Sequence, residues 1–288
     1  RNALGAATDN CDNIAIGSSA LGASVNDADC NIAIGQSALG GADVSGSFNI
    51  AIGISAADAT TTGACNIAIG ENAYGAAAAG ANNIAMGKTA MGGALVTGAD
   101  NFAVGQNALD ALTSGKCNIA LGIDALGAST TGCGNIGIGE TALGGADVTG
   151  YRNVAIGYLV MDALTSGCNN VALGPNALGA ATTGCSNVAL GDTALGGAAV
   201  TGTHNYAMGE GAGKVLTSGK FNILIGCAAG CGLTTGCKNI MIGEITGGVG
   251  TTATGVRNIG IAWSALNQLC DGNDNVAIGY YAMAQQYV

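Results

Sequence analysis

The chain has 288 residues, of which 52 are Gly and 1 is Pro; 9% are charged, 4% are aromatic, and the formal net charge is −10. Soluble domains have about 25% charged residues and about 7% Gly, so an ordinary core of large side chains is excluded, and eight Lys and Arg offer no basic patch for nucleic acid. Hydrophobic residues reach 49%, which excludes charge-driven disorder, yet they form no apolar run long enough for a transmembrane helix.

An Asn recurs along the whole chain at spacings of 17 or 18 residues, with one spacing of 19. Such self-similarity is the signature of a repeat architecture. We therefore predict an all-β fold, a parallel β-roll or β-solenoid of about sixteen coils. The repeat residues are Asn13, Asn31, Asn49, Asn66, Asn83, Asn101, Asn118, Asn135, Asn153, Asn170, Asn187, Asn205, Asn222, Asn239, Asn258 and Asn275.

Each unit begins with a short strand. An apolar residue follows the Asn directly and another lies two residues later, as in Ile14 and Ile16, with a small residue such as Ala15 between them. This period of two predicts a strand. We expect the large residues to point into the interior of the coil and the small residue to face a close neighbour.

The rest of the unit turns the chain back on itself. Gly lies four residues after the Asn in fifteen units, with Ala262 as the exception, and allows a positive φ. The next segment, x-x-Ala-Leu, is predicted to form a second short strand. A linker that usually contains Ser or Thr followed by Gly, as in Thr131-Gly132, closes the coil.

A longer period of 52 residues is superimposed on the coils. The linkers Gly40–Val44, Gly92–Val96, Gly144–Val148 and Gly196–Val200 lie 52 residues apart, which indicates duplication of a three-coil block. No composition shift marks a domain boundary, so residues 1–288 are predicted to be one array that begins in mid-repeat. The segment 258–288, after the longest spacing, is a candidate cap or joint.

The unit Asn-Ile-Ala-Ile-Gly-x-x-Ala-Leu-Gly resembles two related groups of proteins. One is the head of trimeric autotransporter adhesins, whose unit is shorter. The closer one is viral tail-fibre and appendage proteins, where such units are separated by Thr-Gly linkers. The resemblance implies a left-handed β-roll, a homotrimer, and a place outside the cell or on a virion. A strand face with only Ala and Gly would also let chains approach closely.

The function expected from this resemblance is that of a structural fibre or filament shaft, which gives reach, rigidity and attachment. The alternatives are a bacterial trimeric adhesin head that binds a host surface, and the subunit of a head-to-tail extracellular filament. The expected partners are further copies of the chain and a cell-surface glycan or protein, without nucleic acid or membrane insertion.

We expect no enzymatic activity, no cofactor and no metal site. His204 is the only His and belongs to no arrangement of catalytic residues. Cys227-x-x-x-Cys231 lacks a second pair of ligands, so it is a weak metal motif. The repeat Asn residues are predicted to be structural, because stacked amides can bond along the axis or hold the adjacent turn.

Eight of the eleven cysteines lie one or two residues before a repeat Asn. Neighbouring coils would bring together Cys11 with Cys30, Cys117 with Cys133, and Cys168 with Cys185, and the coil spacing lies in the range that a disulfide requires. We therefore predict three disulfides between coils, with buried thiols that act as small apolar side chains as the alternative.

Aromatic residues gather near the end of the chain. They are Trp263, Tyr280, Tyr281 and Tyr287. Two interpretations are open: a surface that contacts sugar or protein, and a cap that shields the last coil.

Overall fold

The computed structural model describes residues 3–5, 11–23, 28–248, 253–268 and 270–284. Throughout these residues the secondary structure consists of strands and turns, and no helix is long and apolar enough to cross a membrane. Two compact units make up the chain, residues 1–149 and residues 150–288. The predicted all-β solenoid is confirmed, and each unit is an array of the predicted coils.

Sixteen strands of three residues each follow the repeat Asn residues. Unit 1 contains β1 (Ile14–Ile16), β2 (Ile32–Ile34), β3 (Ile50–Ile52), β4 (Ile67–Ile69), β5 (Ile84–Met86), β6 (Phe102–Val104), β7 (Ile119–Leu121) and β8 (Ile136–Ile138). Unit 2 contains β9 (Val154–Ile156), β10 (Val171–Leu173), β11 (Val188–Leu190), β12 (Tyr206–Met208), β13 (Ile223–Ile225), β14 (Ile240–Ile242), β15 (Ile259–Ile261) and β16 (Val276–Ile278).

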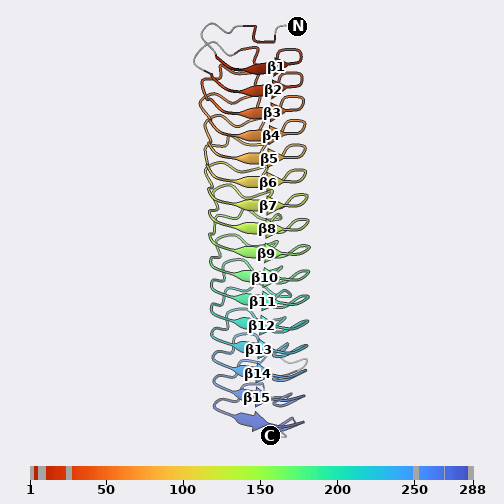
Figure 1. The fold of residues 1–288 in the computed structure, drawn as a ribbon. Helices are drawn as coiled ribbons and strands as arrows, with labels where there is room; N and C mark the ends of the chain where they lie inside the picture. The colour runs from red at the N-terminus through yellow and green to blue at the C-terminus, as the bar shows by residue number, and fades with distance from the viewer. Residues whose placement is uncertain (1–2, 6–10, 24–27, 249–252, 269, 285–288) are drawn as a thin grey trace. The chain divides into compact units, whose positions relative to one another are not determined.

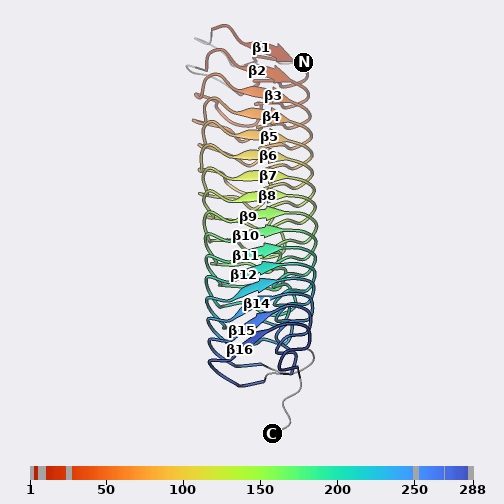
Figure 2. The same cartoon turned by 60° about the horizontal axis from the view of Figure 1, so that its bottom comes forward.

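Within each unit, consecutive strands pair in parallel and in register. Ile119 of β7 lies opposite Ile136 of β8, and Val171 of β10 lies opposite Val188 of β11. The strands of a unit therefore stack in chain order, with the turns and linkers at the sides (Figures 1 and 2). Because every coil repeats the same positions, each position forms a row along its unit; we number positions from the repeat Asn as zero.

The strands are oriented opposite to our prediction. The middle residue, at position +2, faces the interior, and the large residues at +1 and +3 face outward: Ala120 is fully buried, whereas Ile119 is 36% exposed. The reason is space. A Cβ atom at Gly137, the middle residue of β8, would lie 2.9 Å from the carbonyl oxygen of Ala142 and 3.4 Å from Cγ of Leu126, so the interior beside this strand has no room for a second large side chain.

The predicted second strand is also wrong. In the coil of Asn118, the amide of Ala125 donates to the carbonyl of Gly122 and that of Gly127 donates to that of Asp124, which makes two consecutive tight turns. Asp124 and Leu126 have φ of 55° and 51°, the sign that the third residue of a type II turn requires. Leu rarely adopts a positive φ, so the sequence pattern gives no sign of these turns.

The core of each coil is small and is made of a few positions. Besides the middle residue of the strand, the Ala at +7 and the Leu at +8 are fully buried, as in Ala125 and Leu126. One apolar linker residue, such as Leu112 or Val148, closes the interior from the other side. The core is therefore a narrow column in each unit, as predicted from the scarcity of large side chains.

Candidate functional surface

The repeat Asn side chains form a buried ladder inside each unit. Nδ2 of Asn118 donates to Oδ1 of Asn101 at 3.0 Å and to the carbonyl of Gly132 at 2.7 Å, and the amide of Asn135 donates to Oδ1 of Asn118 at 2.9 Å. The Asn thus joins its own coil to both neighbours, and its Nδ2 holds the linker that closes its own coil. Equivalent bonds from amide to Oδ1 link Asn13 through Asn135 in unit 1 and Asn153 through Asn275 in unit 2.

A second row brings backbones into contact at position +4. Gly122 has a φ of 137°, and a Cβ atom there would lie 2.5 Å from the carbonyl oxygen of Gly139 in the next coil. Gly is therefore required twice, for its φ and for the close approach. In the exceptional coil, Ala262 takes this position with a φ of 96°.

The outward residues at +1 and +3 form what we call the outer strand face. Every residue of the face is Ile, Val, Leu, Met, Phe or Tyr, and the two rows run side by side across all eight strands of each unit. Even between two neighbouring strands, Leu173 remains 46% exposed. At about 4.8 Å per strand the face of one unit is roughly 38 Å long, and its two rows, about 7 Å apart, make it roughly 10 Å wide with their side chains. Its area is therefore roughly 400 Å², the size of the largest apolar patch on typical monomers.

Polar and charged side chains border the outer strand face in some coils, whereas in others Ile54 and Ile123 at position +5 or Phe48 and Phe221 at position −1 extend the apolar surface. At position +5, Lys88 pairs with Glu71 at 3.3 Å, and both side chains are exposed. On the opposite border, at position −1, Arg257 pairs with Asp274 at 2.5 Å. An apolar centre with a polar rim is the usual anatomy of a protein–protein interface.

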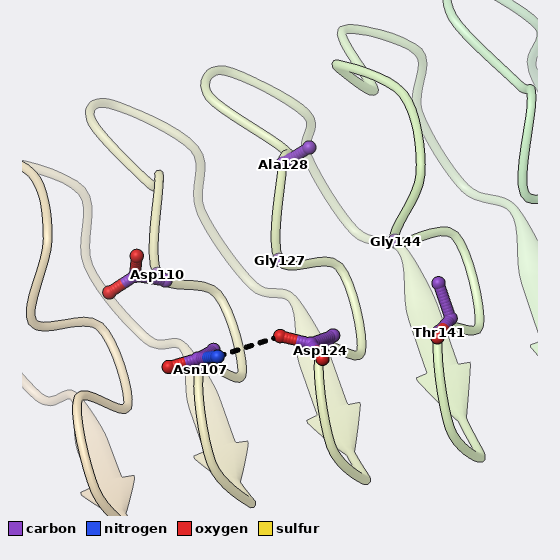
Figure 3. Close-up of a pocket in the computed structure, with 7 residues that line it drawn as sticks. All are labelled: Asn107, Asp110, Asp124, Gly127, Ala128, Thr141 and Gly144. Carbon is purple, nitrogen blue, oxygen red and sulfur yellow. Dashed lines mark hydrogen bonds between the residues drawn. The ribbon is translucent and has the colours of Figure 1, made fainter.

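A shallow pocket of about 400 Å³ lies among the turns of unit 1. Asp110 and Asp124 line it, and Figure 3 shows Nδ2 of Asn107 pointing to Asp124, to which it donates at 2.9 Å. Burial raises the pKa of Asp110, the amides of Gly93 and Gly92 oppose this shift, and the charge of Asp124 adds to it. Among the described residues, no group of three or more His, Cys, Asp or Glu could hold a metal ion.

The Asp110 carboxylate is one of a series spaced by the 52-residue period. Asp58 also lies at position +9; burial raises its pKa, and the nearby amides of Gly41 and Gly40 oppose this shift. A Cβ atom at Gly41 would lie 2.7 Å from both carboxylate oxygens of Asp58, so the glycine leaves the space that this side chain occupies. The Gly-Gly linkers noted in the sequence therefore make room for side chains of the following coil. This explains why the Gly-Gly linkers and the Asp residues at position +9 recur with the same 52-residue period.

The three predicted cysteine pairs differ in whether both cysteines occupy the same position of the repeat. Cys168 and Cys185 both occupy position −2, and their Sγ atoms lie 2.7 Å apart. Cys117 occupies −1 whereas Cys133 occupies −2, where its Sγ contacts the carbonyl of Thr131 at 3.4 Å. Cys11 and Cys30 are offset in the same way, and the amide of Cys30 donates to the carbonyl of Cys11 at 3.1 Å.

Aromatic rings of unit 2 contact one another in two places. Trp263 stacks on Tyr280 with ring centroids 5.1 Å apart, and Tyr281 meets both rings edge to face. Tyr280 is 72% exposed, so the cluster is a surface feature. Tyr287 lies outside the described residues. His204, which the sequence left without a role, stacks on Phe221 at 5.0 Å.

A scan against protein-family models and a search among curated proteins found no match to this chain. The fold and its surfaces are therefore the basis for the function proposed below. The feature that sequence analysis missed is the outer strand face, because we expected its residues to be inside; the uniform rows of large residues at +1 and +3 were the signal for it.

Proposed function

We propose that this chain is a structural shaft of a fibre or filament, in which copies of the chain associate through their outer strand faces. The observation that carries the proposal is the unbroken apolar surface of both units. The face of each unit, at roughly 400 Å², is about half of the roughly 800 Å² that each partner contributes to a standard interface. The role is mechanical, without catalysis: in-register coils supply stiffness, and association supplies thickness and strength.

A homotrimer is the assembly we propose. The chain's resemblance to fibre and adhesin repeats implies three copies, and a narrow apolar face can turn toward a common axis. The first argument for trimers, a strand face of Ala and Gly, no longer holds, because that face is interior. The same resemblance leads us to propose a place on a virion or outside a cell.

Sedimentation equilibrium of the full chain tests this proposal. We expect a mass three times that of the 27.5 kDa chain. The variant Met86→Glu puts a charge in the outer strand face, and we expect it to lower the mass. Its matched control is Leu95→Glu, because Leu95 belongs to the same coil and is exposed but lies in the linker.

Each result has a defined meaning. A monomeric mass for the native chain would contradict association, and a two-chain mass would contradict the trimer. Equal effects of the two Glu variants would show that the chains meet through another surface. Electron microscopy of the native assembly then distinguishes a closed trimer from a longer filament.

An adhesive role is the second candidate, and the exposed cluster of Trp263, Tyr280 and Tyr281 favours it. Such aromatic surfaces combine a large apolar area with polar edges, which suits contact with sugars and proteins. Binding to a panel of glycans by the native chain, lost in Tyr280→Ala with the oligomer intact, would support adhesion. No binding by the native chain would leave the shaft as the whole function.

A further inference from the structure

We propose that Cys168 and Cys185 form a disulfide that staples two adjacent coils of unit 2. They are the two residues at position −2 in the coils of β10 and β11. Their Sγ atoms lie 2.7 Å apart. A disulfide bond is about 2.05 Å long, so the sulfurs need to approach by less than an ångström.

The backbone around the two cysteines already has the separation that a disulfide needs. Neighbouring coils are about 4.8 Å apart, inside the 4.4 to 6.8 Å range of Cα separations in disulfides. The amide of Cys168 donates to Sγ of Cys185 at 3.1 Å, and the amide of Ser186 donates to the carbonyl of Cys168 at 2.9 Å. These bonds fix both residues, so closure requires side-chain rotation without movement of the coils.

The same arrangement occurs at position −2 in other coils, where the side chain is not sulfur. The amide of Cys11 donates to Oδ1 of Asp29 at 2.6 Å, and the amide of Val256 donates to Oδ1 of Asn273 at 2.8 Å. The backbone of this row therefore directs each side chain onto the residue of the preceding coil. Where both residues are Cys, this geometry places one thiol on the other.

The two thiols are within reach of a small oxidant. Both side chains are half-buried, and Tyr151, at position −2 of the preceding coil, lies against Cys168 and is itself exposed. A low-molecular-weight disulfide supplies the oxidising equivalents. The thiolate of one cysteine attacks it and releases one small thiol; the second cysteine then attacks the mixed disulfide and releases the other. The two protons of the cysteines end on the two small thiols, and the protein gains one S–S bond.

Trypsin provides a matched comparison within the native chain. The peptide from Asn153 to Lys214 contains Cys168 and Cys185 and no other cysteine, and the peptide from Cys117 to Arg152 contains only Cys117 and Cys133. The folded full-length chain is incubated with oxidised glutathione, quenched with acid, alkylated in denaturant and digested. Mass spectrometry then counts alkylated thiols in each peptide.

We expect peptide 153–214 to lose two hydrogens and to take no alkyl group, while peptide 117–152 is alkylated on both thiols. In Cys168→Ser, Cys185 should become open to alkylation. Full alkylation of peptide 153–214, or a glutathione adduct that persists on it, would overturn the proposal. Equal closure of both peptides would still support the disulfide but would contradict the role assigned to position −2.

Discussion

At the scale of the residue, the repeat Asn has a hydrogen-bonding capacity that only an amide side chain supplies. Its amide has two donors and an oxygen that can accept two bonds. Asn101 uses all four: it donates to Oδ1 of Asn83 and to the carbonyl of Gly115, and accepts from the amide and Nδ2 of Asn118. Asp lacks the donors, and Leu lacks both functions, which explains why every coil carries Asn.

Replacement of Asn101 by Ala should therefore be costly. It removes the partners of a buried carbonyl and of a buried amide, and each unsatisfied group costs about 1–3 kcal/mol. We expect a loss of about 2–5 kcal/mol in local stability. Because repeat arrays need not unfold in one step, amide hydrogen exchange in the coils next to β6 is the measurement.

The control for this variant is Gln106→Ala, in the same coil. Gln106 carries the same amide group but is exposed. We expect its effect on exchange to stay within about 0.5 kcal/mol. If the two variants behaved alike, the ladder would not be a source of stability.

The glycine at position +4 leads to a second prediction. Gly122→Ala places a Cβ against the carbonyl of Gly139 and leaves a φ of 137°, so we expect a loss of about 2–5 kcal/mol from backbone strain and overpacking. The reverse change, Ala262→Gly, should stabilise its coil by about 1 kcal/mol, because it relieves a φ of 96°. Urea unfolding monitored by amide hydrogen exchange measures the stability of both variants. If Ala262→Gly destabilised its coil, the methyl group of Ala262 would contribute packing that outweighs the strain of its φ.

Asp110 provides a prediction about pH. Because its pKa is raised in the folded state, the folded chain binds the proton more tightly than the unfolded chain, and this residue stabilises the fold least when it is ionised. Its contribution should be largest below the usual Asp pKa of about 3.9 and decline as pH rises above it. Asp110→Asn should remove that decline. Thermal unfolding of the native chain and the variant between pH 3 and 7 should then show a difference in stability that becomes smaller at low pH. A difference that did not vary with pH would contradict this assignment.

At the scale of the element, each coil adjusts its own core volume. In eight of the sixteen coils a small residue at +2 is combined with a Leu at +8, whereas β13 has Leu224 at +2 and its coil has Gly230 at +8. A Cβ atom at Gly230 would lie 2.7 Å from Cδ2 of Leu224, so the Leu occupies the space that the Gly leaves. Tyr74 is a third solution: it is fully buried at +8, and Asn83 donates to its hydroxyl at 2.9 Å.

This exchange of volume predicts strong coupling between Leu224 and Gly230. Leu224→Ala alone should leave a cavity and cost about 2–5 kcal/mol, and Gly230→Leu alone should overpack the coil and cost about 1–3 kcal/mol. The double variant restores the common pattern of small and large residues, so we expect it to be more stable than either single variant. A double-mutant cycle by urea unfolding measures the coupling; additive losses would show that the two residues do not share the same space.

The sequence predicted the strands and the ladder well because both depend on single positions that recur without change, such as Asn118 and Gly122. It could not predict which strand face is interior, since alternation of Ile and Ala specifies two faces but not their direction. Only the turns decide this: Leu126 adopts a positive φ that is unusual for Leu and fills the space that Ile119 would need. The second predicted strand failed for the same reason.

At the scale of the whole molecule, charge and apolar surface act in opposition. The chain carries a formal net charge of −10 and has a pI of about 4.2, so copies repel one another at neutral pH. This repulsion opposes the association of copies through their exposed outer strand faces. Assembly should then depend on how strongly the solvent screens the repulsion.

We therefore expect association to tighten as salt increases, since the screening length falls from about 10 Å at 0.1 M to about 3 Å at 1 M ionic strength. The expected change in affinity between these conditions is roughly tenfold, or about 1.4 kcal/mol. Sedimentation of the native chain at both salt concentrations measures it, with Met86→Glu as the control that should remain less associated at each. Association that weakened with salt would mean that ion pairs such as Lys88–Glu71, and not the outer strand face, hold the copies together.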